Sequence, residues 1–573
     1  MKPNRLLVAL SCAYLILAAY LAYMQIGRAD YYISLSEKNR IRILYLEAPR
    51  GRILDRRGDP MATSRLSFNC SVVPHEAKKT IAQSCLIVAG ILNEDPKELE
   101  ERYYKRKPGA FNTVLLAEDI DPEKAMRIEE RIDDLPGFMI ETRPQREYMH
   151  GESVAHLVGY IGPMIQDELD SLDSYGYRRA DWIGREGIEK SYESYLRGQS
   201  GGLQIEVDNR GRLVKVMGVK EPEDGKDIQL TIDSRLQAFA QELLKDQKGA
   251  VIVMDLNDGG ILSINSAPSF DPNLFASTRG RRDVGKYLKG RQSPMVNRGL
   301  RGQYPPGSIF KIVTTLAAME QKKVNLFSSF TCQGYWAIGN RRFKCWKTEG
   351  HGPQILTEAI AHSCDVFFYR TGLLAGADAI AQMALRFGLG LPTGIDLPEE
   401  RKGFVPTKEW KKRTRHEVWY EGETANFAIG QGYLQMTPIQ ALTMAAGIAT
   451  GGELLKPHVI DKISGVTVAE RHAKSLSLAK KYVDAVKEGM DQAVNSDTGT
   501  GRLARVKGLG IAGKTGTAQS GQEEDHAWFV GYAPKNHPRY ATVVFIEHGG
   551  HGGVAAAKVA GALFGWLKEN TYL

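Results

Sequence analysis

Residues 304–319, YPPGSIFKIVTTLAAM, predict a buried helix with a serine and a lysine close to its start. The Pro-Pro-Gly turn ends the preceding segment and places Ser308 in the first turn of that helix. The residues that follow are apolar almost all round, which is typical of a helix in a protein core. Because residues three apart share a helix face, the Lys311 ammonium lies within reach of the Ser308 hydroxyl. Burial disfavours the charged form of a lysine, so Lys311 is a candidate base for Ser308.

Two further motifs follow in the order typical of serine acyltransferases that use lysine as their base. Ser363-Cys364-Asp365 offers a second hydroxyl beside a carboxylate, and Lys514-Thr515-Gly516 offers a cation on a predicted strand. Each motif is weak alone, and Ser477 to Lys480 is a second match to S-x-x-K. That match lies in an exposed helix rich in Lys and Ala, where nothing would dehydrate the lysine. We therefore assign the nucleophile to Ser308.

A nucleotide-binding loop is the alternative from another enzyme class. Gly508 to Thr515 satisfies the pattern G-x-x-x-x-G-K-[ST], which cradles phosphates. Such a loop requires a buried strand before its first glycine and a long helix after its threonine. Here the basic stretch Arg502 to Lys507 precedes the pattern and Thr517 to Gly521 follow it, so we interpret the segment as a strand.

The N-terminal segment is apolar enough to span a membrane. Leu6 to Ile26 is an uncharged run of 21 residues, which as a helix is about 31 Å long. Lys2 and Arg5 precede it, which predicts a cytoplasmic tail of residues 1–5 and an external location for the rest of the chain. A cleaved signal peptide is the alternative, but the run is long for one and lacks a small-residue cleavage site.

Composition is that of a folded protein, with 43% hydrophobic and 25% charged residues. The formal net charge is +8, and the basic residues are scattered, with no block that indicates nucleic-acid binding. We therefore expect no nucleic-acid partner. Contact with an anionic membrane surface accounts for the charge.

The chain is expected to be an α+β protein with a single N-terminal transmembrane helix and two domains outside the membrane. Residues 27–229 mix charged helices with short strands and gather no set of His, Cys and acidic residues, which indicates an extended α+β pedestal. Residues 230–573 carry all three motifs. Their predicted strands at 250–254 and 261–264 flank the turn Asn257-Asp258-Gly259-Gly260.

A second strand pair, 527–532 and 540–547, and a closing helix at 553–568 are predicted near the C-terminus. Strands from both ends of one domain, with helices between them, predict an antiparallel sheet packed between helices.

Nearly the whole chain resembles the class B penicillin-binding proteins, which are single-pass peptidoglycan transpeptidases. Besides the three motifs, the resemblance rests on Arg50-Gly51-Arg52-Ile53-Leu54-Asp55-Arg56, Ala155-His156, Gly159-Tyr160, Gly184 to Tyr192, Gly430-Gln431-Gly432 and Thr437-Pro438. It implies a division into a tail (1–5), a transmembrane helix (6–26), a pedestal or dimerisation-type domain (27–229) and a penicillin-binding transpeptidase domain (230–573).

The resemblance also implies the chemistry of the site. Ser308 would be acylated by a D-Ala-D-Ala stem peptide, with release of the last D-Ala, and Lys311 would take the serine proton. Ser363 would relay protons to and from the leaving and attacking amines.

The third motif would recognise the substrate. Lys514 and Thr515 would bind its carboxylate, and Gly516 would let the peptide approach the strand edge. The Thr517 amide would join that of Ser308 in an oxyanion hole.

One residue departs from the usual family pattern, in which the second motif ends in Asn. Asp365 occupies that place here, and its carboxylate beside Lys311 and Ser363 would favour a charged lysine. An Asp at this position resembles the elongation-type branch, which builds the side wall. The alternatives are a septal transpeptidase, a β-lactamase or β-lactam sensor, and a non-catalytic scaffold of the wall-synthesis complex. A lactamase has no use for a pedestal, and the familiar sensors have longer cytoplasmic segments.

Four residues between the first two motifs could bind a structural zinc ion: Cys332, Cys345, His351 and Cys364. Cys₃His is a closed zinc ligand set, although the gaps are wider than those of zinc fingers. Several elongation-type relatives resemble this segment and carry metal ligands at equivalent places. A Cys332–Cys345 disulfide is the alternative outside the cytoplasm. Acyl transfer itself needs no cofactor.

The resemblance implies the surroundings of the enzyme as well. Stem peptides and β-lactams would bind at the site. A SEDS-family membrane glycosyltransferase and other rod-complex proteins would bind through the anchor and pedestal. The protein would reside in the bacterial inner (cytoplasmic) membrane, with its catalytic domain on the periplasmic side.

Overall fold

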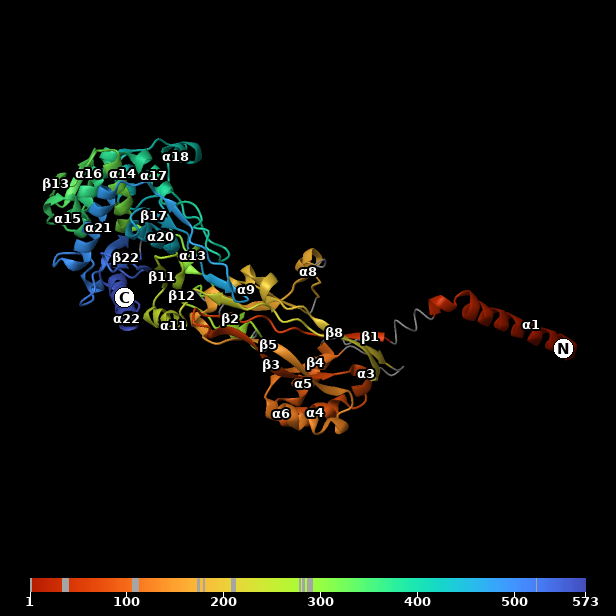
Figure 1. Cartoon of the computed structure of the whole chain (residues 1–573). Coiled ribbons are helices and arrows are strands. Elements are labelled where there is room, and N and C mark those ends of the chain that lie inside the picture. The colour runs from red at the N-terminus through yellow and green to blue at the C-terminus, as the bar shows by residue number, and fades with distance from the viewer. Residues whose placement is uncertain are drawn as a thin grey trace. The chain divides into compact units, whose positions relative to one another are not determined.

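The computed structural model contains two compact units, which are described separately (Figure 1). The first comprises Met1–Arg50, Ser64–Gln145 and Arg197–Gly225, and the second comprises Gly51–Thr63, Arg146–Leu196 and Lys226–Leu573. The structure describes residues 3–32, 41–105, 113–172, 176–178, 181–207, 213–277, 280, 284–285, 292–521 and 523–573. Residues 51–63 and 146–196, assigned by sequence to the pedestal, thus belong to the unit that carries the three motifs. The division into functional domains at residue 230 stays a prediction.

The N-terminal helix has the length and composition of a membrane span. α1 (Pro3–Ala22) continues as a short π-helix, Tyr23–Gly27. The segment Leu7–Gly27 has a mean hydropathy of 2.0, and none of its most apolar window is buried. Within the described part of the chain, it is the one helix long and apolar enough to cross a bilayer. The structure is therefore consistent with a single-pass membrane protein.

The first unit contains an α/β core and a separate three-stranded sheet. In the core, β3 (Pro60–Val72) pairs antiparallel with β4 (Val114–Ile120). The helices that share its hydrophobic cluster are α4 (Ile81–Leu92), α5 (Pro96–Lys105) and α6 (Pro122–Glu129). The separate sheet has the order β1-β8-β9, formed by Ile41–Leu46, Gly201–Val207 and Leu213–Lys220.

The second unit is built around a five-stranded antiparallel sheet with the order β12-β11-β23-β22-β21. Its strands are β11 (Gly249–Asp255), β12 (Ile261–Ala267), β21 (Ala512–Ala518), β22 (His526–Ala533) and β23 (Tyr540–Ile546). The two strand pairs expected from the sequence therefore join through β11 and β23, and β21 forms one edge of the sheet. The predicted α+β architecture is confirmed.

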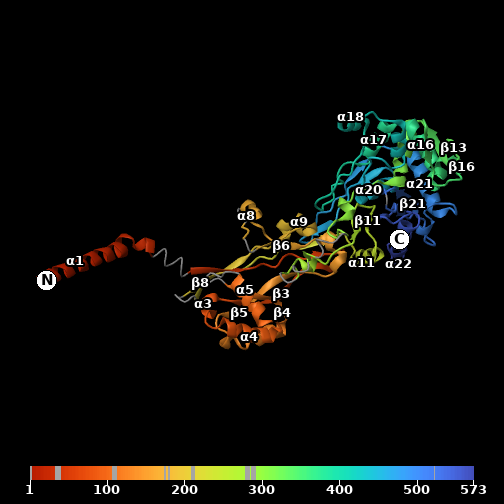
Figure 2. The ribbon, with the colours of Figure 1, turned by 180° about the vertical axis from the view of Figure 1, so that it is seen from behind.

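Helices cover both faces of this sheet, because its strands are apolar on both sides. Val251 and Val253 pack in one hydrophobic cluster with α11 (Ser234–Leu243) and α22 (Ala555–Glu569). Ile252 and Met254, which alternate with them, pack in another cluster with α20 (Pro438–Ala449). Figures 1 and 2 show α11 and α22 together on one side of the strands and α20 on the other.

The helical part of the second unit holds the helix predicted after Ser308. A 3-10 turn, Gly307–Phe310, leads into α14 (Lys311–Glu320), which is buried from Lys311 to Met319 as its composition predicts. Against it pack α16 (Asp365–Ala375), α17 (Ala377–Arg386) and α21 (Lys480–Asn495). α15 (Leu356–Ala361) packs on α21 and shares a hydrophobic cluster with the end of α14. Four short strands, β13 to β16 (Ser329–Cys332, Tyr335–Ile338, Arg341–Lys344 and Gly352–Ile355), form two nested hairpins between α14 and α15.

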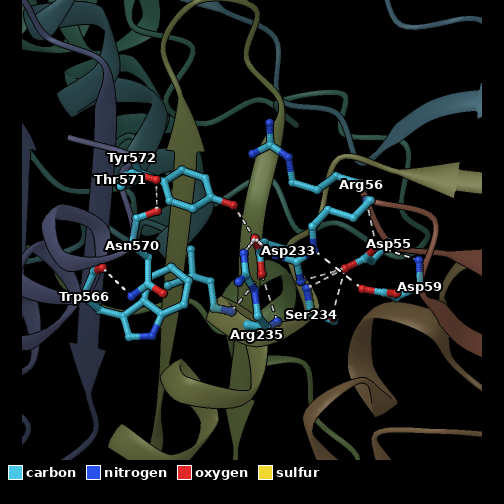
Figure 3. A network of polar contacts seen from close by, with 12 residues as sticks. Asp55, Arg56, Asp59, Asp233, Ser234, Arg235, Trp566, Asn570, Thr571 and Tyr572 are labelled. Carbon is cyan, nitrogen blue, oxygen red and sulfur yellow. Dashed lines mark hydrogen bonds and ion pairs between the residues drawn. The ribbon is translucent and has the colours of Figure 1, made fainter.

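A buried polar network fixes residues 51–63 within the second unit (Figure 3). Asp55 accepts hydrogen bonds from the Arg57 amide (2.8 Å) and the Ser234 hydroxyl (2.8 Å). Asp233 accepts from the Arg57 guanidinium (2.9 Å) and from the Tyr572 hydroxyl, and both carboxylates are fully buried. Burial by itself would raise the pKa of Asp55, but the bonds from Ser234 and Arg57 lower it. The network ties the C-terminal end of the chain to this segment.

Candidate active site

Ser308 lies in the 3-10 turn that precedes α14, and close backbone packing holds this turn on both sides. Gly307 has a φ of +57°, and a Cβ there would lie 2.5 Å from the Thr517 carbonyl oxygen. The Gly307 amide donates to the Gly430 carbonyl at 2.9 Å. Only glycine accommodates this conformation and this contact at low cost. The Pro-Pro-Gly segment therefore sets the turn between β21 and the Gly430 loop.

Lys311 is fully buried and points toward the second motif. Its Nζ pairs with Asp365 Oδ1 at 2.7 Å and donates to the Ser363 carbonyl at 2.8 Å and the Ser363 hydroxyl at 3.3 Å. Among the hydrogen bonds of the described residues, none joins Lys311 to the Ser308 hydroxyl. Lys311 therefore pairs with the Asp by which the second motif departs from the usual family pattern.

Ser363 lies between the two lysines of the site. Its φ of +54° is uncommon for a residue other than glycine, and such strained positions cluster at functional sites. Lys514 Nζ donates to Ser363 Oγ at 2.9 Å and to the Thr515 carbonyl at 2.9 Å. Ser363 thus contacts Lys311 and Lys514 through one hydroxyl.

The two buried lysines of this cluster differ in their relation to the Asp365 carboxylate, because Lys311 pairs with it. Lys514 is fully buried, like Lys311, but forms no ion pair with Asp365 within the described residues. Burial, and then the charge of Lys311, hold the pKa of Lys514 well below its ordinary value. The site therefore combines one ion-paired lysine with one that readily becomes neutral.

The third motif lies on β21, at the edge of the sheet, as predicted. Lys514 and Thr515 pair with Val530 and Phe529 on β22. A Cβ on Gly516 would lie 2.9 Å from the Pro306 carbonyl oxygen, so this glycine lets the Ser308 turn approach the strand. A nucleotide-binding loop is thus excluded, because Lys514 is in mid-strand.

The second S-x-x-K match is exposed, as expected, but only its lysine lies in a helix. Lys480 is almost fully exposed and pairs with Asp484 at 2.8 Å, one turn along α21. Ser477 is exposed and lies before this helix. The two residues resemble the first motif in sequence only.

A loop that sequence reasoning missed connects the second and third motifs. Thr515 Oγ1 donates to Thr500 Oγ1 at 2.8 Å, and Thr500 Oγ1 donates to the Ala361 carbonyl at 3.2 Å. In the same loop, the Thr498 hydroxyl lies 2.9 Å from His362 Nε2. The sequence around Thr500, D-T-G-T-G, carried no signal beyond its small residues.

Trp346 was also missed, and it lies beside the second motif. Its amide donates to Asp365 Oδ2 at 3.0 Å, opposite the oxygen that pairs with Lys311. Its indole donates to the His362 carbonyl at 3.1 Å, and the side chain is 57% exposed. Both oxygens of Asp365 are therefore engaged.

The four candidate metal ligands converge in one place. Cys332, Cys345, His351 and Cys364 each offer an atom within 4.8 Å of the others, and the three cysteines are buried. The Cys345 sulfur lies 3.6 Å from His351 Nδ1. All cysteines in the described residues are free, including Cys332 and Cys345, so the expected alternative, a disulfide between these two, is not formed in this structure.

The chemistry of the four ligands fits a zinc ion. Hydrogen bonding from Cys364 lowers the pKa of Cys345 to about 2 against the opposing effect of burial, whereas the same contact raises that of Cys364. Thiolate is the form that binds metal. His351 Nε2 is buried without a hydrogen-bond partner among the described residues. Three sulfurs and one imidazole are a closed structural zinc set.

Comparison with known families decides the assignment of the chain. Residues 249–565 match the penicillin-binding protein transpeptidase domain, and residues 45–230 match the penicillin-binding protein dimerisation domain. The chain belongs to the penicillin-binding protein transpeptidases. The family resemblance predicted from the three motifs is confirmed.

Similar proteins support a more specific assignment of this transpeptidase. The peptidoglycan D,D-transpeptidase MrdA of Acinetobacter baumannii is 34% identical over 580 residues, which cover 96% of this chain and 85% of that protein. MrdA of Haemophilus influenzae is 32% identical over 568 residues, covering 94% and 87%.

Solved structures agree with these relatives. The structure of Helicobacter pylori PBP2 in complex with MreC matches with a TM-score of 0.83 and 28% identity, covering 93% of this chain and 99% of that one. Pseudomonas aeruginosa PBP2 in complex with WCK 5153 matches with a TM-score of 0.70 and 31% identity, covering 92% and 97%. This transpeptidase is a serine-type D,D-transpeptidase of the elongation type, and the septal, β-lactamase, sensor and scaffold alternatives are not favoured.

Proposed function

We propose that Ser308 carries the acyl-enzyme through which this transpeptidase cross-links peptidoglycan stem peptides during elongation. The Ser308 oxygen attacks the carbonyl carbon between the two terminal D-Ala residues, and the C–N bond breaks. The last D-Ala leaves with its amine protonated. The amine of a second stem peptide then attacks the ester, which forms the cross-link and regenerates the serine.

Lys311 and Ser363 move the protons in this proposal. Lys311 takes the Ser308 proton once its own proton has passed to a neighbour, and the Ser363 hydroxyl at 3.3 Å can relay it. Taking the Ser308 proton restores the charge of Lys311, and Asp365 remains its ion-pair partner. Ser363 also donates to the leaving amine.

Substrate recognition is assigned to β21 and the loop beside it. The carboxylate of the terminal D-Ala binds Lys514 and Thr515. The hydrogen bond between the Thr515 and Thr500 hydroxyls orients the Thr515 side chain. The amides of Ser308 and Thr517 stabilise the oxyanion of the tetrahedral intermediate. Close packing of the Gly307 turn against the Thr517 carbonyl supports this pairing.

The observation that carries the proposal is the meeting of three motifs from distant parts of the sequence. Lys311 and Ser363 are 52 residues apart, and Ser363 and Lys514 are 151 residues apart, yet their side chains contact each other. The test is mass spectrometry of the penicillin adduct. The drug should be attached to Ser308, and Ser308→Ala should remove it while Ser477→Ala should not. Attachment at any other residue would refute the assignment of Ser308 as the nucleophile.

We also propose that Cys332, Cys345, His351 and Cys364 hold a structural zinc ion. The ion would supply no acyl-transfer chemistry. Cys364 lies between Ser363 and Asp365, so its ligation would hold the second motif in position. Metal analysis of the purified wild type and of Cys364→Ser tests this, and equal, negligible zinc in both would refute the site.

The remaining assignments concern location and partners. We propose that α1 anchors the chain in the inner membrane and that the catalytic unit lies in the periplasm. We also propose a SEDS-family glycosyltransferase and rod-complex proteins as partners. The similarity to PBP2 in complex with MreC, and to a chain of a peptidoglycan synthase complex with a TM-score of 0.75 and 28% identity, supports this. Co-purification of the full chain with these partners, compared with a chain lacking residues 1–27, provides the test.

A further inference from the structure

A segment remote from the three motifs has a high local excess of positive over negative charge. Residues 401–416 contain seven basic residues and one acidic residue, a net charge of +6, whereas the whole chain carries +8. The sequence interpretation, which described the basic residues as scattered, overlooked this block. Its centre is α18 (Lys408–Arg415), which Figures 1 and 2 both show at the outer edge of the second unit beside α17.

Part of this charge is compensated within the protein, and part is not. Lys408 pairs with Asp378 at 2.8 Å, and Lys411 pairs with Glu423 at 2.6 Å and Glu417 at 3.2 Å. Five exposed cations form no ion pair among the described residues: Arg401, Lys402, Lys412, Arg413 and Arg415. A solvated helix surface normally alternates charges, so this excess of one sign favours an anionic ligand.

Exposed apolar side chains follow the free cations in the sequence. Val418 and Tyr420, just beyond α18, are 62% and 61% exposed. We call Lys412, Arg413, Arg415, Val418 and Tyr420 the basic surface. Cations beside an exposed aromatic ring suit a ligand that carries both carboxylates and apolar or sugar groups.

The basic surface is joined to the Ser308 turn by packed aromatic rings. Trp410 of α18 lies 5.2 Å from Tyr433, which follows the Gly430 loop that binds the Gly307 amide. On the other side, Trp419 lies 6.1 Å from Phe427, which stacks on Phe310 at 5.4 Å. The surface is therefore held in a defined position with respect to the nucleophile.

We propose that the basic surface binds the carboxylate-bearing stem peptides of an uncross-linked glycan strand and so delivers the strand to the site. The proposal rests on the transpeptidase function given above, because that function defines an acidic glycopeptide as the substrate. The strand would bind through ion pairs to the helix cations, and its apolar and sugar groups would contact Tyr420 and Val418. Binding of this kind weakens as salt rises.

The experiment uses the full chain in detergent after acylation with penicillin, so that the catalytic serine is blocked and only secondary binding is measured. Immobilised uncross-linked peptidoglycan strands serve as the probe, over a series of NaCl concentrations. The variant K412E/R413E/R415E should bind about tenfold more weakly than wild type and lose most of the salt dependence. The matched control K78E/K79E/K97E, which changes the net charge equally in the first unit, should bind like wild type.

Two further binding experiments distinguish stem peptides from glycan and from anionic lipid as the ligand. Strands stripped of their peptides with an amidase should not compete, and anionic phosphatidylglycerol vesicles should bind wild type and variant equally. Wild-type binding by the triple variant, competition by stripped strands, or vesicle binding that the variant loses would each overturn the proposal. A penicillin acylation rate of the triple variant within twofold of the wild-type rate shows that the variant is folded. If its rate is lower than that, the binding experiment is repeated with K412Q/R413Q/R415Q. If the proposed transpeptidase function is itself wrong, the wild type will form no penicillin adduct, and this result is independent of strand binding.

Discussion

Replacing Asp365 with asparagine should destabilise the protein strongly, although the change is nearly isosteric. In the structure, Lys311 is fully buried and its ammonium lies 2.7 Å from Asp365 Oδ1. The second oxygen of Asp365 accepts from the Trp346 amide at 3.0 Å. An asparagine has one acceptor oxygen, so either the ammonium or the amide loses its partner.

Two independent arguments give the size of the effect. Removing one partner of a buried ion pair costs about 3–5 kcal/mol, because the other charge stays in a poorly solvated place. Deprotonating an ordinary lysine at pH 7, which is the alternative open to the variant, costs about 5 kcal/mol. The free energy of unfolding of Asp365→Asn at pH 7 should therefore fall by about 3–5 kcal/mol.

Urea unfolding of the detergent-solubilised chain, followed by tryptophan fluorescence, measures this loss. Glu423→Gln is the matched control, because the buried Lys411 keeps Glu417 as a partner when Glu423 is lost. The control should lose clearly less stability than Asp365→Asn. A loss for Asp365→Asn below about 1 kcal/mol, or equal to that of the control, would refute the view that Asp365 neutralises a buried ammonium.

Three further predictions concern parts of the chain outside the reacting groups. His156 is buried, and burial, followed by the charge of Arg298, lowers its pKa to about 4. In the unfolded chain this histidine binds a proton below about pH 6.5, whereas in the folded chain it does so only near pH 4. The free energy of unfolding should therefore be at its full value above pH 6.5 and fall by about 3 kcal/mol toward pH 4. Unfolding measured against pH should show a smaller decline for His156→Gln. Tyr572→Phe should cost about 1–3 kcal/mol in thermal unfolding, since it leaves Asp233 without one charge-assisted donor, and an unchanged melting temperature would count against the network. A zinc chelator should lower the melting temperature of the wild type but not of Cys364→Ser, and equal shifts in both would contradict metal binding.

The local patterns of the sequence predicted the main elements well. Two short apolar runs around the Asn-Asp-Gly-Gly turn located β11 and β12, and the uniformly apolar run after Ser308 located α14. These signals succeed because hydrophobic periodicity and turn residues act over a few neighbouring residues. The three motifs in their order, together with the matching segments elsewhere in the chain, were likewise enough to predict the family.

Other parts of the site could not be predicted from local patterns. Thr500 and Trp346 belong to the site only because the chain folds back on itself over long separations, and neither stands in a motif that demands their side chains. The basic block around α18 is visible in the sequence, but the sequence does not show which of its cations are paired, as Lys408 and Lys411 are.

The sequence alone determined which chemical groups this transpeptidase possesses: an apolar N-terminal helix, a serine at a helix start, two lysines, a strand that carries the third motif, and three cysteines with a histidine between the first two motifs. Only the tertiary structure decided which of these groups pair with one another and which are ionised. Asp365 pairs with Lys311 and not with Lys514, and the charge of a buried lysine depends on which one holds the carboxylate. Ionisation is set by desolvation and by neighbours a few ångströms away, and those neighbours come from residues far apart in the chain.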